Sequence, residues 1–62
     1  MSIAEWLYNY GYASDDAKAI AEAHAAGGIE AAVAVINDYD DAEHDYTGEL
    51  RECIQQAERE LP

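Results

Sequence analysis

The sequence predicts an all-α fold, a small compact helical bundle of three short helices followed by a longer C-terminal helix. Two observations indicate this fold. Apolar residues recur at intervals of three and four along most of the chain, which is the spacing of one face of a helix. Glycines and N-capping residues fall at the ends of these periodic segments. With 62 residues, residues 1–62 are expected to form a single acidic helical domain with one thin core.

The first helix is expected to begin at a capping box, in which Ser2 accepts a hydrogen bond from Glu5 and Glu5 reaches back. Gly11 suits the left-handed position after a helix end. Tyr8 lies on the opposite face from the core and is a candidate interface residue. The inner stripe consists of Ile3, Trp6, Leu7 and Tyr10.

Two further short helices follow. The second starts at Ser14, which is expected to be its N-cap, and ends at Gly27 and Gly28. The third runs from Ile29 to about Asn37. The residues expected on the inner faces of these two helices are Ala17, Ile20, Ala21, His24, Ile29, Ala32, Val33 and Ile36.

Residues 38–46 break the periodicity and are expected to form an acidic loop. The last helix is predicted from about Thr47, a candidate N-cap, to about Glu60. Its inner face consists of Leu50, Cys53, Ile54, Ala57 and Leu61.

Charge is the strongest clue to function. Fourteen acidic residues face three basic ones, a formal net charge of −11, which argues against binding to nucleic acid or to anionic lipid. We expect no signal peptide and no apolar segment long enough to span a membrane. The lone Cys53 excludes an internal disulfide, and the chain is therefore expected to be cytoplasmic.

Half of the acidic residues fall within residues 38–52, which we call the acidic segment. Tyr39 and Tyr46 lie among these acids, whereas disordered acidic runs are poor in aromatic residues. The candidate partner-binding residues are Asp38, Tyr39, Asp40, Asp41, Glu43, Asp45, Tyr46, Glu49 and Glu52. Secondary candidates on the second helix are Asp15, Asp16 and Glu22.

Other interpretations of the same residues are weaker. The acidic segment could be a solvated loop without a partner. A calcium loop with Asp38 and Asp40 as its first ligands would have Ala42 and Glu43 where a ligand and a glycine are needed. His24 and His44 lie on different elements, and no motif supports a nucleophile or an oxyanion hole. We therefore expect no enzyme activity, no metal, no cofactor and no small-molecule ligand.

The N-terminal part of the chain resembles the ubiquitin-associated (UBA) domain pattern. The resemblance covers about residues 3–37 and rests on the loop motif Tyr10-Gly11-Tyr12 and on the helix start Ile29-Glu30-Ala31-Ala32-Val33. It implies a three-helix fold. Ubiquitin binding in this family depends on a hydrophobic patch at the loop, where Tyr10 replaces the usual methionine. The resemblance therefore implies the fold more strongly than it implies ubiquitin binding.

The later part resembles a piece of the ArdA antirestriction proteins, which are acidic DNA mimics of plasmids and phages. The resemblance rests on Gly28-Ile29-Glu30-Ala31-Ala32, on Ile36-Asn37-Asp38-Tyr39 and on Asp45-Tyr46 before an acidic helix. It implies inhibition of a restriction enzyme. With the charge, it leads to the expectation of a DNA-mimic inhibitor that competes for the basic channel of a restriction enzyme or a CRISPR effector complex. The alternatives are a UBA-like protein-interaction module and an antitoxin-like acidic regulator.

Overall fold

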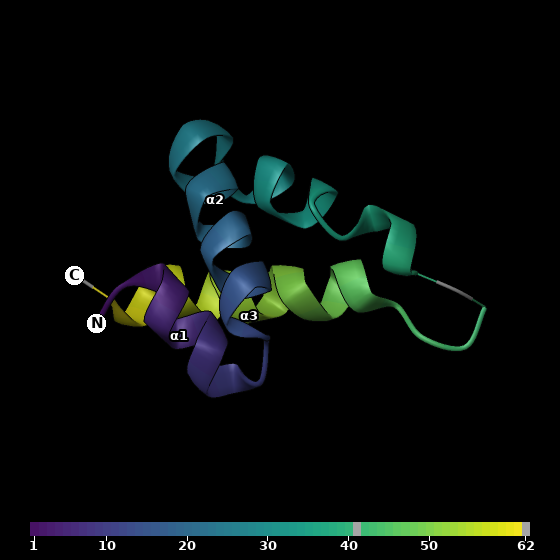
Figure 1. The fold of residues 1–62 in the computed structure, drawn as a ribbon, viewed down its shortest axis with the longest axis horizontal. Coiled ribbons are helices and arrows are strands. Elements are labelled where there is room, and N and C mark those ends of the chain that lie inside the picture. Colours follow the sequence, from purple (N-terminus) through teal and green to yellow (C-terminus); the bar gives the residue numbers. More distant parts are fainter. Residues whose placement is uncertain (41, 62) are drawn as a thin grey trace.

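The structure, a computed structural model, describes residues 1–40 and 42–61. In chain order, its elements are the helices α1 (Ile3–Tyr10) and α2 (Ser14–Ala34), the short 3-10 helix η1 (Asn37–Tyr39) and the helix α3 (Tyr46–Glu60). The described residues contain no strand, so the all-α prediction is confirmed. Figure 1 shows α3 running beneath a sharply bent α2.

The ends of α1 follow the sequence-based expectation. The backbone N–H of Glu5 donates to the Ser2 hydroxyl over 3.2 Å, and that hydroxyl lies 3.4 Å from Oε1 of Glu5. Gly11 ends the helix at φ 132°, and its N–H donates to the carbonyls of Leu7 and Tyr8. Capping box and glycine stop together confine this helix to eight residues.

The bend in α2 is produced by Gly28, which has φ 79° and ψ −163° inside an otherwise helical stretch. This region of backbone conformation is open essentially to glycine alone. The chain therefore turns back at the position where the sequence predicts the second helix to end and the third to begin (Figure 1). The start of α2 differs from the prediction, because Ala13 is the N-cap and Ser14 is the first helical residue, without a side-chain cap.

The three helices enclose one apolar cluster. Leu7, Ile20, Leu50 and Ile54 are its largest fully buried side chains, each contributed by α1, α2 or α3. Trp6 is half-buried beside the cluster, and its indole N–H donates to the carbonyl oxygen of Cys53 over 3.2 Å, which ties α1 to α3. The remaining buried residues are Ala17, Ala32, Val33, Ile36, Cys53 and Ala57.

Most of the predicted inner stripes are buried, with one clear exception. Tyr10 was expected in the core but is 52% exposed. Its ring stacks on that of Tyr12, with centroids 6.0 Å apart. Tyr10 therefore packs on Tyr12 at the surface and does not enter the cluster.

The expectation that no apolar segment is long enough to span a membrane is wrong, because one helical stretch has the length and composition of a membrane span. The helical stretch Ser14–Tyr39 has an 18-residue window with a mean hydropathy of 1.4. Core helices of water-soluble proteins have the same property, and in this fold the stretch bends at Gly28 and contributes Ile20 and Val33 to the core.

The conformation of Gly28 leads to a testable prediction. We expect Gly28→Ala to destabilise the fold by about 1–3 kcal/mol, because an L residue is strained at this φ and ψ. An added Cβ would meet no atom within 4 Å, so the loss would come from the backbone and not from a clash. Chemical denaturation followed by circular dichroism measures the difference.

The matched control for this prediction is a synthetic chain with D-alanine at position 28. The mirror image of the Gly28 conformation is an ordinary extended conformation for an L residue. A D residue prefers the mirror images of L conformations, so D-alanine should fit at position 28 without loss of stability. An L-alanine variant as stable as the wild type would show that the bend does not depend on glycine.

Candidate acidic interaction surface

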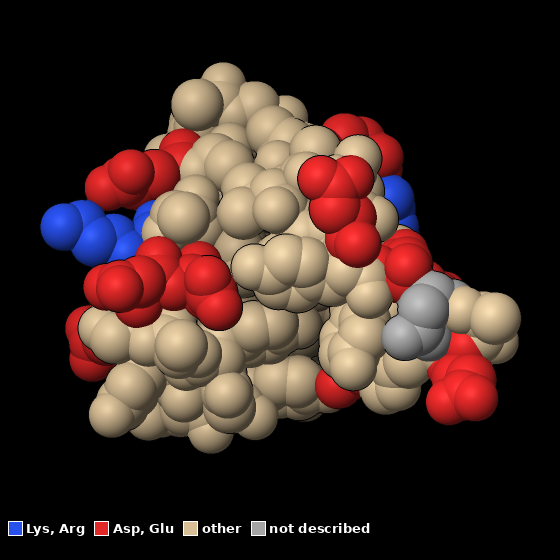
Figure 2. Space-filling view, turned by 45° about the vertical axis from the view of Figure 1, so that its right-hand side comes forward, with Lys and Arg blue, Asp and Glu red and all other residues tan. Residues whose placement is uncertain are grey.

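The acidic side chains lie at the surface. Among the described residues no charged or polar side chain is buried, and of the acids only Asp16 and Glu49 are half-buried. Figure 2 shows the acids of one face in two groups at opposite ends, with an uncharged band between them. The carboxylates are therefore available to a partner but do not form one continuous sheet of charge on this face.

Few of these carboxylates have a cationic neighbour. Arg51 is the one lysine or arginine with an ion pair within residues 1–40 and 42–61. It contacts both carboxylate oxygens of Glu30, one of them over 3.1 Å, and this pairing lowers the pKa of Glu30 and raises that of Arg51. Because both groups are exposed, the pair adds little stability and leaves the large excess of negative charge in place.

Two histidines also contact acids. Nε2 of His24 lies 2.8 Å from Oε2 of Glu58, which places this half-buried ring between α2 and α3. Nε2 of His44 lies 2.5 Å from Oε2 of Glu49. His24 was expected on the inner face of its helix and is half-buried there, and each ring gives an acid a hydrogen-bonding partner.

The acidic segment is organised around the N-terminus of α3. Asp45, not Thr47, is the N-cap, and its side chain accepts from the backbone N–H of Gly48 over 3.0 Å. Thr47 instead binds Asp40, donating to it from its backbone N–H over 2.9 Å and from its hydroxyl over 2.6 Å. Two of the predicted partner-binding carboxylates thus close the end of a helix.

These hydrogen bonds change the ionisation of Asp40. The Thr47 hydroxyl, and then the Thr47 backbone N–H, hold the pKa of Asp40 below its ordinary value of 3.8. Asp40 therefore remains a carboxylate in mild acid, and both of its oxygens are engaged by the protein itself.

The aromatic residues of the acidic segment remain exposed. Tyr39 is 56% exposed in η1, and Tyr46 is 40% exposed at the first position of α3. The ring of His44 lies against that of Tyr46, with centroids 4.1 Å apart. Since η1 packs against α3, the structure brings the two tyrosines into one region of the surface.

The other predicted partner-binding residues are distributed as follows. Asp38 lies in η1, Glu43 in the bend before α3, and Glu52 on the exposed side of α3. Asp41 lies outside the described residues. The secondary candidates Asp15, Asp16 and Glu22 all lie in the first half of α2, on a different element from the acidic segment.

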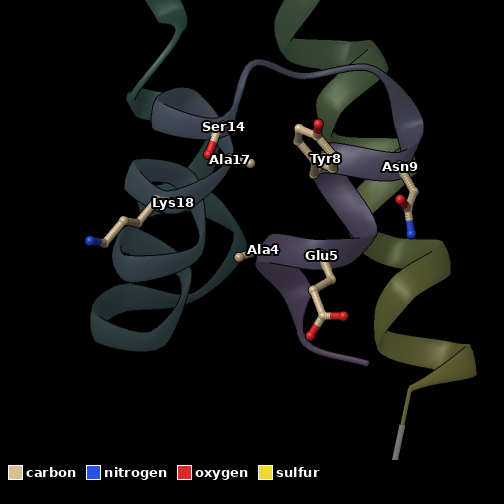
Figure 3. Close-up of a pocket in the computed structure, with 7 residues that line it drawn as sticks. All are labelled: Ala4, Glu5, Tyr8, Asn9, Ser14, Ala17 and Lys18. Carbon is tan, nitrogen blue, oxygen red and sulfur yellow. The ribbon is translucent and has the colours of Figure 1, made fainter.

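Sequence reasoning missed a groove between α1 and the start of α2, which has a volume of about 600 Å³ (Figure 3). Tyr8 was correctly placed on the outer face of its helix and is 60% exposed. The groove forms because Tyr8 stands opposite Ser14 and Ala17 of α2. Helical spacing shows which residues of one helix share a face, but it contains no information on which faces of two helices meet.

Metal and thiol chemistry have no support in the described residues. No three of the described histidine, cysteine, aspartate and glutamate side chains are placed so that they could hold a metal ion. Cys53 is buried, and burial raises the pKa of its thiol. A buried thiol of raised pKa is a poor nucleophile, so Cys53 is best explained by packing.

No protein-family model, curated protein or solved structure matches this chain.

The role of Asp40 in closing α3 can be tested against a residue of equal charge. We expect Asp40→Asn to lower the melting temperature at neutral pH, because it weakens the bonds from Thr47. Asp38→Asn removes the same charge two residues away, where no hydrogen bond with a described residue is lost, and should leave the stability equal or slightly higher.

The difference between the two variants should also depend on pH in a defined way. A carboxyl with a folded pKa below 3.8 stabilises the fold fully above that value. Its contribution disappears as the pH falls through the folded pKa, so the two variants should converge in strong acid. A difference that stays constant between neutral pH and pH 2 would contradict the role of the Asp40 charge.

Proposed function

We propose that this protein is an acidic DNA mimic that inhibits a bacterial nucleic-acid-binding defence system, either a restriction enzyme or a CRISPR effector complex. The single observation that carries the proposal is the excess of negative charge: fourteen acids face three bases, no described acid is buried, and Arg51 is already paired with Glu30. The fold does not need this charge, which repels itself across a small body. A basic partner surface would turn the repulsion into attraction.

The spacing of the acids supports the comparison with DNA. Duplex DNA carries one negative charge per about 1.7 Å of its axis, so fourteen carboxylates equal the charge of about 24 Å of duplex. Glu49 and Glu52 are three residues apart on α3, which places their Cβ atoms about 5–6 Å apart. That distance is similar to the spacing of phosphates along one strand. The partner would bind by competition, with association accelerated by charge.

The hydrogen bonds around Thr47 give the acidic segment a second useful property. Asp40 accepts hydrogen bonds from Thr47, and Asp45 accepts one from Gly48, so both carboxylates are fixed at the start of α3. A charged surface that is ordered before binding loses less conformational entropy when its partner arrives. We therefore assign partner contact chiefly to Asp38 and Glu52, which form no hydrogen bond or ion pair with other described residues, and assign positioning of the segment to Asp40 and Asp45.

A second candidate function has an observation of its own. Tyr8 and Tyr10 are both exposed on α1. Exposed tyrosines are frequent anchors of protein interfaces. A UBA-like protein-interaction module, in which the acidity is incidental, is therefore the alternative proposal.

The function can be tested with two double variants of equal net charge. Asp38→Asn with Glu52→Gln neutralises two acids of the acidic segment that form no hydrogen bond or ion pair with other described residues. Glu58→Gln with Glu60→Gln removes the same charge at the other end of α3. Each protein is expressed in bacteria that carry one defined restriction or CRISPR system, and phage plating efficiency is measured.

We expect the wild type and the Glu58/Glu60 variant to protect the phage. The Asp38/Glu52 variant should bind the purified target on the order of tenfold more weakly, at about 1 kcal/mol or less per lost ion pair. DNA should compete with the wild type for the target. If DNA and this protein bind the target together, or if both double variants behave alike, mimicry by the acidic segment is disproved.

Salt should act on folding and on binding in opposite directions. Raising sodium chloride from about 0.1 M to about 1 M shortens the Debye length from about 10 Å to about 3 Å. We expect the melting temperature of the free protein to rise, because repulsion among the acids is screened. Affinity for the target should fall steeply over the same range. Binding that is insensitive to salt would favour the UBA-like alternative.

A further inference from the structure

The groove between α1 and α2 has a small-residue floor and an aromatic wall. Ala4 from α1 and Ala17 from α2 face one another across it, and Tyr8 stands one helical turn after Ala4 (Figure 3). The small side chain of Ala4, which is only partly buried, allows a guest side chain to approach the backbone of α1, while the tyrosine ring provides a large apolar surface beside it. At about 600 Å³, the groove is large enough for several side chains of a peptide.

The charges around the groove select the kind of guest. Glu5 is exposed on its α1 side. Lys18 lines the α2 side, but Figure 3 shows its amine directed away from α1. Asp15 and Glu22 stand three residues before and four residues after Lys18, which are the positions of helical neighbours and offset its charge. The field over the groove is therefore negative, and it favours a cationic guest.

We propose that this groove is a docking site for a basic peptide segment of a partner protein. One apolar side chain of the size of leucine lies over Ala4 and against the Tyr8 ring, and a flanking arginine stacks on Tyr8 with its guanidinium toward Glu5. A second copy of this chain does not fit the charge, because each copy carries −11. The site goes beyond the proposed function, since it uses α1 and the start of α2 and does not require the acidic segment.

The exposure of Tyr8 supports its role as the anchor. It is 60% exposed, and its hydroxyl has no hydrogen bond with a described residue. A tyrosine ring beside an apolar groove exposes a large surface that a guest would cover, and tyrosine is among the residues that contribute most to protein interfaces. Tyr39 has nearly the same exposure, 56%, on a different element, which makes it the matched control.

The test uses a short capped peptide with one leucine flanked by two arginines, titrated into the ¹⁵N-labelled full chain. We expect chemical-shift changes to concentrate at Ala4, Tyr8, Ser14 and Ala17. Replacing the leucine with glycine, or both arginines with glutamine, should weaken binding by about tenfold or more. If the peptide with both arginines replaced by glutamine binds as tightly as the original, the preference for a basic guest is wrong.

Variants of the protein separate a site from general attraction between opposite charges. Tyr8→Ala should weaken binding of the peptide by about tenfold or more, whereas Tyr39→Ala should leave it unchanged. Glu5→Gln keeps the capping box and should weaken binding by about twofold to fivefold, while Glu60→Gln, with the same charge change, should have no effect. Circular dichroism confirms that each variant keeps its helices.

The outcomes distinguish this proposal from the proposed function. The double variant Asp38→Asn/Glu52→Gln should bind the peptide as the wild type does. If that variant loses the peptide while Tyr8→Ala retains it, the peptide binds the acidic segment and the groove proposal is overturned, with DNA mimicry unaffected. Shift changes spread over all acidic residues, or no binding at millimolar peptide, would also overturn it.

Discussion

Repulsion among the acidic side chains is the constraint to which the rest of the structure is adapted. A chain of 62 residues with a net charge of −11 has only a thin core to oppose it. The largest fully buried side chains are three leucine-sized residues from α1 and α3 together with Ile20 of α2, and alanine fills the gaps between them. Every described acid lies at the surface in water, where repulsion is weakest, and none enters the core.

Several of the acids lie at helix N-termini. Asp40 and Asp45 lie at the N-terminus of α3, and Asp15 and Asp16 lie in the first turn of α2, where the helix dipole favours negative charge. Acids in these positions stabilise the fold even though the molecule has too many of them. The acidic segment is thus partly a structural feature, since two of its carboxylates close the N-terminus of α3.

The sequence was sufficient for the parts of the fold that depend on near neighbours. Periodicity located the buried faces, including Ile20, Val33 and Ile54, and Gly28 marked the bend. Contacts between distant residues were beyond it. Thr47 has the sequence position of an N-cap, but in the structure it binds Asp40, seven residues away. Tyr10 has the spacing of a core residue, but its ring stacks on Tyr12 at the surface. The groove beside Tyr8 depends on how two helices pack, and helical spacing within one helix does not predict it. The sequence indicated the charge of the acidic segment but not the hydrogen bonds that Asp40 and Asp45 form within it.

The hydrogen bond from Trp6 to Cys53 gives the molecule a built-in optical reporter. Trp6 is the only tryptophan, and it is half-buried at the contact of α1 with α3. Its fluorescence is therefore expected to respond when α1 separates from α3, even if both helices stay helical. Circular dichroism responds to the loss of helix instead. Recording both signals on the same sample would show whether the N-terminal helix undocks before the bundle unfolds, without attaching any label to so small a chain.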